Sequence, residues 1–275
     1  MKGFEGRLAA VTGAGSGIGR ALAEELAGRG AHLALADIDE VGLAETEGRC
    51  GRGVKVTTAR LDVADRSAVE AWADQVVGEH GRVDLVVNNA GVAAVASVEE
   101  MSHDDLRWVV DIDFWGVVHG TKAFLPHLKA AGEGHIVNVS SVFGLLSVPS
   151  QSAYNAAKFA VRGFTDTLRM ELDIERCGVS CTTVHPGGIK TNIVRNARIG
   201  DAAADMAGGI ERFRERFDRT AMTTPDSAAR QILAAVARNR RRVLVGPDAK
   251  LLDLVSRLPA GLYQRVVVAG ARLRG

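Results

Sequence analysis

Apolar runs of strand length alternate along the chain with longer stretches in which apolar residues recur at helical spacing. Several of these runs are apolar at nearly every position, which is typical of parallel strands that helices cover on both faces. The pattern predicts an α/β fold with a doubly wound parallel sheet of about seven strands and helices on both faces, in a single domain over residues 1–275. The expected strands are Leu8–Val11, His32–Ala36, Val54–Leu61, Val83–Val87, His135–Val139, Val179–Val184 and Val243–Val245.

Local sequence signals predict two helix starts, a substrate loop and a C-terminal extension. Ser102, with Asp105 three residues on, is typical of a capped helix start, and Thr224 followed by Pro225 is another. Residues 188–224 show no strand pattern and are long for a connection, so we expect a substrate loop or lid there. An apolar stripe in this segment favours either simple packing or a substrate wall: Met206, Ile210, Phe213 and Phe217. Residues 248–275 form a C-terminal extension.

Composition and charge narrow the function classes. A formal net charge of +1 does not favour nucleic acid or an acidic partner. The three cysteines show neither a metal-binding spacing nor an even disulfide set, so we expect no metal and a reducing, cytoplasmic setting. The first residues lack the apolar stretch of a signal peptide, and no apolar run reaches membrane-spanning length.

A glycine-rich loop from Thr12 to Gly19 directly follows the first expected strand and opens a helical stretch. Glycines let the backbone turn tightly and approach a pyrophosphate, and the helix N-terminus offers free N–H groups. A structural turn without a ligand is the alternative, but the strand before and the helix after favour a dinucleotide site in a Rossmann fold. The expected contacts come from Gly13, Ser16, Gly17, Ile18 and Gly19.

An acidic residue ends the second expected strand. Asp37 lies 20 residues after Gly17, where a carboxylate accepts hydrogen bonds from the adenosine ribose of NAD and repels the 2′-phosphate of NADP. Neither Ser16 nor Ile38, which we also expect at the cofactor, offers a cation for that phosphate, and Arg20 lies one turn into the helix. We therefore expect NAD, with NADP less favoured. The alternative role for Asp37 is that of a helix cap.

Tyr154 and Lys158 stand four residues apart, so on a helix their side chains share a face. Tyrosine titrates near pH ~10, and a base at neutral pH needs a depression of about 3 units, or ~4 kcal/mol. One ammonium at ~4 Å supplies ~4 kcal/mol at an effective dielectric of ~20, and an oxidised nicotinamide adds further positive charge. The pair therefore permits acid–base catalysis. Taken alone, this spacing is also typical of an ordinary surface pair.

In combination these elements resemble the short-chain dehydrogenase/reductase family over essentially the whole chain. Besides the glycine loop and the Tyr154/Lys158 pair, the resemblance rests on Asn88-Asn89-Ala90-Gly91, on Ser141 thirteen residues before Tyr154, and on Pro186-Gly187. It implies hydride transfer between NAD(H) and a secondary alcohol or ketone. It also implies a homodimer or homotetramer formed through two long helices near Ser102–Ala130 and Ser152–Glu175.

The resemblance implies a role for each matching residue. Tyr154 exchanges a proton with the substrate oxygen, Ser141 binds that oxygen, and Lys158 binds the nicotinamide ribose and lowers the tyrosine pKa. The other implied cofactor contacts are Asp62 and Val63 at the adenine, Asn89, Ala90 and Gly91 along the cofactor, and Pro186, Gly187, Ile189 and Thr191 at the carboxamide. Ser140 competes with Ser141 for its role, Asn88 is equally explained by support of the sheet, and Pro186-Gly187 by an ordinary turn.

One position departs from the family pattern. In the stretch Asp111-Ile112-Asp113-Phe114-Trp115-Gly116, Asp113 stands where the family usually has a catalytic asparagine. A main-chain role survives the change, so we keep Asp113 in the catalytic group with Ser141, Tyr154 and Lys158. A carboxylate near Lys158 would partly cancel the field of the ammonium on Tyr154, unless burial protonates it. We hypothesise a raised basic pKa of turnover; the alternative is a harmless substitution.

Apolar candidate walls around the site, Val92–Val95 and Val142–Val148, favour a hydrophobic alcohol or ketone. In the C-terminal extension, Leu251, Val255 and Leu258 share a helical face. Packing on the body or on a second subunit is the favoured interpretation of that face, and a membrane-surface contact is the alternative. Two other function classes stay open: a cofactor-binding regulator without turnover, and an epimerase or dehydratase, against which the glycine spacing argues.

Overall fold

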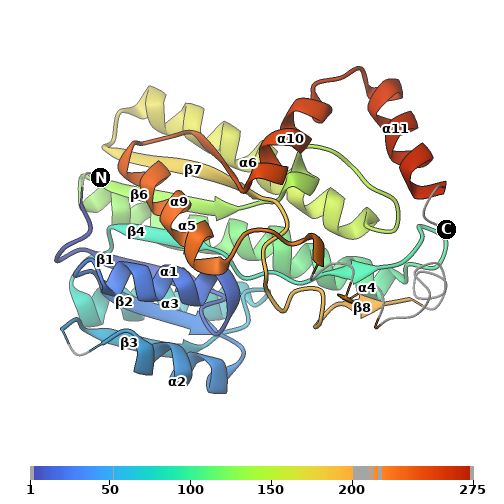
Figure 1. The fold of residues 1–275 in the computed structure, drawn as a ribbon. Helices are drawn as coiled ribbons and strands as arrows, with labels where there is room; N and C mark the ends of the chain where they lie inside the picture. Colours follow the sequence, from blue (N-terminus) through green and yellow to red (C-terminus); the bar gives the residue numbers. More distant parts are fainter. Residues whose placement is uncertain (1–2, 52, 201–210, 212–213, 216–218, 273–275) are drawn as a thin grey trace.

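The computed structural model describes residues 3–51, 53–200, 211, 214–215 and 219–272 (Figure 1). Within these residues, seven parallel strands form one sheet in the order β3-β2-β1-β4-β6-β7-β9. The prediction of a doubly wound sheet is confirmed, since each of the seven apolar runs contains or overlaps one of these strands. Their bounds are Leu8–Thr12 (β1), His32–Asp37 (β2), Val56–Arg60 (β3), Leu85–Asn88 (β4), Gly134–Val139 (β6), Val179–Pro186 (β7) and Arg242–Val245 (β9).

Helices cover both faces of this sheet because alternate residues of each strand point to opposite sides. In β1, Ala9 and Val11 pack into the core beneath α1 (Gly17–Ala27) and α9 (Pro225–Ala237). Leu8 and Ala10 instead belong to the core beneath three further helices, α3 (Arg66–His80), α5 (Gly116–Ala130) and α6 (Ser152–Glu175). The remaining helix near this part of the sheet, α2 (Glu40–Arg49), leads into the edge strand β3 (Figure 1).

The two predicted helix starts are present. The Ser102 hydroxyl accepts a hydrogen bond from the Asp105 N–H at the start of α4 (His103–Val110), and Thr224 caps α9 with Pro225 in its first turn. The first long helix that we expected is a continuous run of three elements. α4 passes through a π-helical turn, η1 (Asp111–Trp115), into α5, which contains Pro126.

The segment 188–224 contains one short strand, contrary to expectation. Arg198–Ile199 (β8) pairs in parallel with Ala94–Val95 (β5), and an isolated bridge joins Ile189 to Thr223. A strand of two residues is too short to show an alternating pattern, which is why periodicity did not reveal it. The apolar stripe that we expected here falls outside the described residues: Met206, Ile210, Phe213 and Phe217.

The C-terminal extension forms α10 (Pro247–Ser256) and α11 (Ala260–Arg272). Figure 1 shows α11 lying beyond α10, away from the central sheet. The buried carboxylate of Asp253 joins α10 to β9, since it pairs with Arg242 at 3.2 Å. The same carboxylate also pairs with Arg257, at the end of α10, at 2.8 Å. The outer face of α10 is apolar, with Leu251 and Leu254 62% and 65% exposed. Among the described helices, none is both long and apolar enough to cross a bilayer.

Candidate active site at the carboxyl edge of the sheet

The expected site residues meet at one edge of the sheet, because the carboxyl ends of parallel strands all face the same way. The glycine loop follows β1, Asp37 ends β2, Asn89–Gly91 follow β4, Ser141 follows β6, and Pro186 ends β7. Such an edge is where doubly wound sheets bind their ligands. The topology alone therefore brings five segments, distant in sequence, to one place.

The glycine loop leaves no room for side chains at its key positions. Gly13 and Gly17 have φ angles of +66° and +53°, which L side chains rarely adopt. A Cβ atom on Gly19 would lie 2.0 Å from the carbonyl oxygen of Gly13, and one on Gly13 would lie 2.8 Å from the Cα of Ala90. Ser16, the N-cap of α1, makes no side-chain capping bond, and the first turn holds no acidic residue. This helix start therefore fits an anionic group such as a pyrophosphate.

Asn88, the last residue of β4, and Asn89, the residue after it, make different contacts. Asn89 holds the glycine loop: its side chain donates to the carbonyl oxygens of Thr12 and Gly13, at 3.1 and 3.2 Å. Thr12 accepts in return from the backbone N–H groups of Asn89 and Ala90. Asn88 instead points into the interior and donates to Asn138 at 2.8 Å. Support of the sheet, the alternative raised for Asn88, is what its contacts show.

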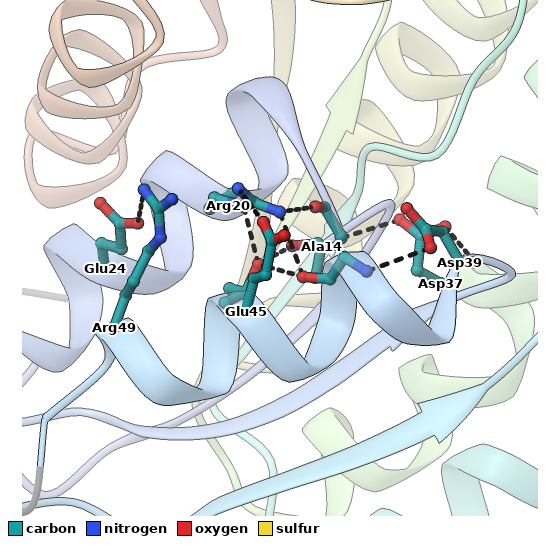
Figure 2. A network of polar contacts seen from close by, with 10 residues as sticks. Ala14, Arg20, Glu24, Asp37, Asp39, Glu45 and Arg49 are labelled. Atoms are coloured by element: carbon teal, nitrogen blue, oxygen red, sulfur yellow. Dashed lines mark hydrogen bonds and ion pairs between the residues drawn. The ribbon is translucent and has the colours of Figure 1, made fainter.

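Figure 2 shows the polar network behind the glycine loop. Asp37 accepts hydrogen bonds from the backbone N–H of Gly15 at 2.8 Å and of Asp39 at 3.0 Å. The cap of α2 is Asp39, which accepts from the Gly42 N–H. The helix-cap alternative therefore applies to Asp39 and not to Asp37. Ile38 lies between them with its side chain exposed.

Arg20 is the cation nearest to the glycine loop in sequence, and its contacts bind it to α2. Its guanidinium donates to Thr46 at 3.0 Å and to the Gly15 carbonyl, and it pairs with Glu45 at 3.0 Å (Figure 2). It joins α1 to α2 behind the loop. Beside β3, Asp62 is exposed and accepts from the Ala64 N–H, whereas Val63 is buried.

Tyr154 and Lys158 share one face of α6, as their spacing requires. The Lys158 ammonium lies 5.4 Å from the centre of the Tyr154 ring and donates to the Val139 carbonyl at 3.2 Å. The Ser141 side chain acts on the Tyr154 phenol as a hydrogen-bond partner, whereas the hydroxyl of Ser140 donates to the main-chain carbonyl of Lys158 at 2.8 Å. Of the two serines, Ser141 is the one that faces the phenol.

Asp113 lies in the π-helical turn η1 and has no exposed surface. One of its carboxylate oxygens accepts from the Val92 N–H at 2.7 Å, and the other lies 3.0 Å from the Lys158 ammonium. Burial raises the pKa of the Tyr154 phenol; the Lys158 charge opposes this effect and the Asp113 charge adds to it. Burial acts to lower the pKa of Lys158, but Asp113 and Tyr154 together outweigh it, so that pKa is raised.

The loop after β7 reaches back to the glycine loop. A Cβ atom built on Gly17 would lie 3.0 Å from the methyl group of Thr191, so the two loops touch. Ile189 is buried, and a Cβ on Gly187 would lie 2.2 Å from a carboxylate oxygen of Asp248. Asp248 also accepts from the Gly188 N–H at 2.6 Å. The first turn of α10 thus fixes the loop that contains the predicted residues Pro186 and Gly187.

Two residues that the sequence did not reveal support this arrangement. The sequence places Asp248 only in the C-terminal extension, although Pro247 followed by Asp248 is typical of a helix start. His185, fully buried in β7, makes a hydrogen bond from its ring Nδ1 to the main-chain carbonyl of Ser141 at 2.8 Å. Burial lowers the pKa of His185 to about 4, so the ring is uncharged at neutral pH. The one sequence feature that could have indicated this role of His185 is a polar residue inside an apolar strand.

Comparison with known proteins agrees with this geometry. The sequence profile described as short chain dehydrogenase matches residues 7–202. The chain belongs to the short-chain dehydrogenase family. This oxidoreductase family was the one that the glycine loop and the Tyr154/Lys158 pair indicated.

Individual relatives of this short-chain dehydrogenase cover nearly all of it. The SadH protein of Mycobacterium tuberculosis is 52% identical over 272 residues, which are 98% of this chain and 97% of SadH. Among solved structures, a short-chain dehydrogenase/reductase from Burkholderia phymatum in complex with NAD is 34% identical, with a TM-score of 0.86 over 93% of this chain and 94% of that one. Levodione reductase is 28% identical, with a TM-score of 0.78 over 90% and 99% of the two chains.

Proposed function

We propose that this short-chain dehydrogenase transfers a hydride between NAD(H) and a hydrophobic secondary alcohol or ketone, with Tyr154 as the acid–base residue. The observation that carries the proposal is the meeting of the Tyr154 phenol, the Ser141 side chain and the Lys158 ammonium near Gly91, where a Cβ atom would lie 3.4 Å from that ammonium. A proton donor, a second hydrogen-bond partner and a cation at one point are what the reduction of a carbonyl requires.

In ketone reduction, Tyr154 gives its proton to the carbonyl oxygen while Ser141 donates a hydrogen bond to the same atom. In alcohol oxidation, the phenolate takes the hydroxyl proton. The charge of Lys158 opposes the rise of the Tyr154 pKa that burial causes, and its ammonium is the group that would bind the nicotinamide ribose. The bound cofactor supplies or accepts the hydride at the carbon of the reacting bond. His185 and Phe143 fix Ser141 through its carbonyl and its hydroxyl, respectively.

The residues present fit a dinucleotide. The pyrophosphate would lie at the start of α1, where Gly13, Gly17 and Gly19 leave space that side chains would fill. Asp37 would bind the adenosine ribose, and its carboxylate supports NAD over NADP. The contacts of Arg20 with α2 support the same preference, since they hold this cation behind the loop. The remaining contacts would come from Ser16, Ile18, Ile38, Asp62, Val63, Asn89, Ala90, Gly91, Pro186, Gly187, Ile189 and Thr191.

The surroundings of Tyr154 support a hydrophobic substrate. The ring of Phe143 meets the Tyr154 ring edge to face at a centroid distance of 6.2 Å. The apolar residues near Ser141 in sequence include the buried Val142, Leu145 and Leu146. The likeness to levodione reductase adds support for a ketone.

The decisive experiment is a panel of hydrophobic ketones and secondary alcohols, each assayed with NAD(H) and NADP(H) by the change in nicotinamide fluorescence. We expect turnover with NAD(H), and its loss in Tyr154→Phe with cofactor binding retained. Binding of NADH without turnover of any member would instead favour the regulator alternative. The absence of binding to either cofactor would contradict the proposal altogether.

We further propose that the chain assembles as a homo-oligomer through α5 and α6, as the resemblance implies. Trp115, at the end of η1, and Met170 and Ile174, on α6, are large apolar residues left 46%, 55% and 81% exposed. Light scattering after size exclusion should give a dimer or tetramer for the starting chain and a smaller species for Ile174→Lys. An unchanged mass in that variant would place the interface elsewhere.

We propose a second contact surface in the C-terminal extension, formed by the exposed leucines of α10. Another subunit is its favoured partner. Leu258 and Leu262, at the junction with α11, are also exposed, and Arg265 is the nearest cation on α11. Co-sedimentation of the full chain with anionic vesicles, compared with a chain ending at Gly246, tests the alternative of a membrane surface. We expect no co-sedimentation of either chain at physiological salt.

A further inference from the structure

The feature that departs from the family pattern lies inside the site itself, at the pair formed by Asp113 and Lys158. The Lys158 side chain is 4% exposed and that of Asp113 not at all, and the two charged groups are 3.0 Å apart. A catalytic lysine that serves to make a phenol acidic would act most strongly without an opposite charge beside it. This chain places a buried carboxylate in that position.

The geometry indicates that Asp113 is ionised. One carboxylate oxygen accepts from the Val92 N–H at 2.7 Å, and the other forms an ion pair with the Lys158 ammonium at 3.0 Å. A protonated carboxyl would have to direct its own hydrogen at one of these donors. Burial raises the pKa of the Asp113 carboxyl, while the Lys158 charge and the Val92 N–H act against that rise. The hydrogen bond on one oxygen and the ammonium beside the other favour the carboxylate.

The ion pair changes what Lys158 does to the phenol. An ammonium beside a carboxylate is a dipole, and the field of a dipole falls off faster with distance than the field of a single charge. Lys158 also gives part of its donor capacity to Asp113 and to the Val139 carbonyl. The site therefore holds Lys158 in place while much of its electrostatic effect on Tyr154 is cancelled.

Few other charges among the described residues face this group. The elements packed against α6 include β6 and β7, whose His135 and His185 have their pKa lowered by burial to about 3 and about 4 and are uncharged at neutral pH. Burial raises the pKa of Cys181, also on β7, to about 12, so this thiol is neutral too. On η1, Asp111 lies two residues before Asp113 and is half-buried.

Several charges on α4 and α6 are paired at the surface, and Lys122 on α5 is exposed. On α4, Asp105 pairs with Arg198 at 2.7 Å, and the exposed Asp104 lies near Arg107 at 3.9 Å. On α6, Arg162 pairs with Asp166 at 3.7 Å. His103, at the start of α4, is exposed. The charges that act on the phenol are those of Lys158 and Asp113.

We propose that the Asp113–Lys158 ion pair keeps Tyr154 protonated at neutral pH, so that the resting site holds the phenol ready to donate a proton to a ketone oxygen. Reduction uses the protonated phenol, and its rate falls as pH rises and Tyr154 loses its proton. Oxidation uses the phenolate, and its rate rises over the same range. Asp113 is a positioning residue in this account because it acts through Lys158. This proposal rests on the proposed function for the reaction that Tyr154 serves. The protonation state of Tyr154, in contrast, is tested without substrate.

The chain offers a direct readout because it contains only two tyrosines, Tyr154 and Tyr263. In a Tyr263→Phe background, the near-ultraviolet absorbance of tyrosinate reports Tyr154 alone, without cofactor or substrate. We expect no tyrosinate at neutral pH and a titration at alkaline pH. Tyrosinate already present at neutral pH would overturn the proposal, and this measurement needs no change at Asp113.

The matched variants are Asp113→Asn and Asp104→Asn in the same background. Asp113→Asn keeps the size of the side chain and removes its charge, so the tyrosinate titration should move to lower pH. Asp104→Asn removes a carboxylate whose side chain is 95% exposed and should leave the titration unchanged. An unchanged or higher midpoint in Asp113→Asn, with the circular dichroism of the starting chain, would overturn the proposal.

Kinetics supply the second arm. In Asp113→Asn with Tyr263 intact, kcat for oxidation at saturating NAD and alcohol should rise at neutral pH by roughly three- to tenfold, and the pH profiles of both directions should move to lower pH. A purely structural role for Asp113 would lower both rates and leave the profiles in place, which would contradict the proposal. Failure of every ketone and alcohol to react would refute the proposed function, while the tyrosinate titration would still decide the ionic state.

Discussion

The two halves of the site are built by opposite means. The cofactor half, at the start of α1, depends on the absence of side chains, since Gly13 and Gly19 are crowded by backbone atoms. The reaction half, at α6 and η1, depends on two charged side chains that are buried together, Lys158 and Asp113. Changes in the cofactor half should therefore act by steric exclusion and affect binding. Changes in the reaction half should act through charge and proton transfer and affect turnover.

The largest expected effect tests the reaction half. Tyr154→Phe removes the proton donor and keeps the ring that packs on Phe143, so turnover should fall about 10²- to 10⁴-fold. The midpoint of thermal unfolding and the affinity for NADH should stay close to those of the starting chain. Steady-state kinetics and fluorescence titration separate the two quantities. A loss of turnover smaller than about tenfold would assign the proton to another group.

The cofactor half is tested by Gly19→Ala. The new methyl group would lie 2.0 Å from the Gly13 carbonyl oxygen, so the loop must shift, at a cost of about 1–3 kcal/mol. We expect weaker binding of NADH and a lower unfolding midpoint, measured by fluorescence titration and calorimetry.

The control for that change is Gly78→Ala in α3. A Cβ atom there meets nothing within 4 Å, and alanine favours a helix over glycine by roughly 0.5–1 kcal/mol. This variant should bind NADH normally and unfold no earlier than the starting chain. Equal behaviour of the two variants would show that crowding in the glycine loop is not what binding depends on.

The contrast between the two halves also explains what the sequence revealed. The seven strands and the glycine loop follow from local patterns, because an apolar run or a glycine spacing is contained in one short segment. The tyrosine and the lysine share one helix, so their proximity follows from spacing as well. The contact between Asp113 and Lys158 joins segments 45 residues apart, and only the family resemblance suggested it.

Other parts of the site had no local signal. The contact of Asp248 with Gly187 and Gly188 joins the start of α10 to the loop after β7, and no periodicity reports such a pairing. His185 stands in an apolar strand, where its hydrogen bond to Ser141 depends on the sheet register. The short pairing of β5 with β8 likewise appears only once the loops are placed. These contacts depend on tertiary structure.

A smaller effect is expected at Asp37, the one carboxylate of the cofactor half that binds the glycine loop. Asp37→Ala should weaken NAD binding by about tenfold, or ~1.4 kcal/mol, and narrow the ratio of NAD to NADP affinity. The physical reason is the loss of the acceptor for the Gly15 N–H in the loop and for the Asp39 N–H beside it, and of the charge that repels a 2′-phosphate.

Asp39→Ala is the matched control for Asp37, because it also removes a carboxylate that accepts a backbone hydrogen bond nearby. It deletes the cap of α2 and should lower stability by roughly 0.5–2 kcal/mol without changing the cofactor ratio. Cofactor titrations of both variants decide the matter. An equal ratio in Asp37→Ala and the starting chain would refute the assignment of NAD preference to Asp37.

The smallest effect on binding is expected at Arg20, although it is the cation nearest to the loop in sequence. Its contacts with Thr46, Gly15 and Glu45 hold it between α1 and α2 (Figure 2). Arg20→Met keeps an unbranched side chain and loses these bonds, so the free energy of unfolding should fall by about 1–3 kcal/mol. The ratio of NAD to NADP affinity should not change, because a guanidinium occupied behind the loop gives nothing to a 2′-phosphate. A selective loss of NADP binding in this variant would show that Arg20 turns to the ligand, and the contrast between a cofactor half built on crowded glycines and a reaction half built on buried charges would then fail at this residue.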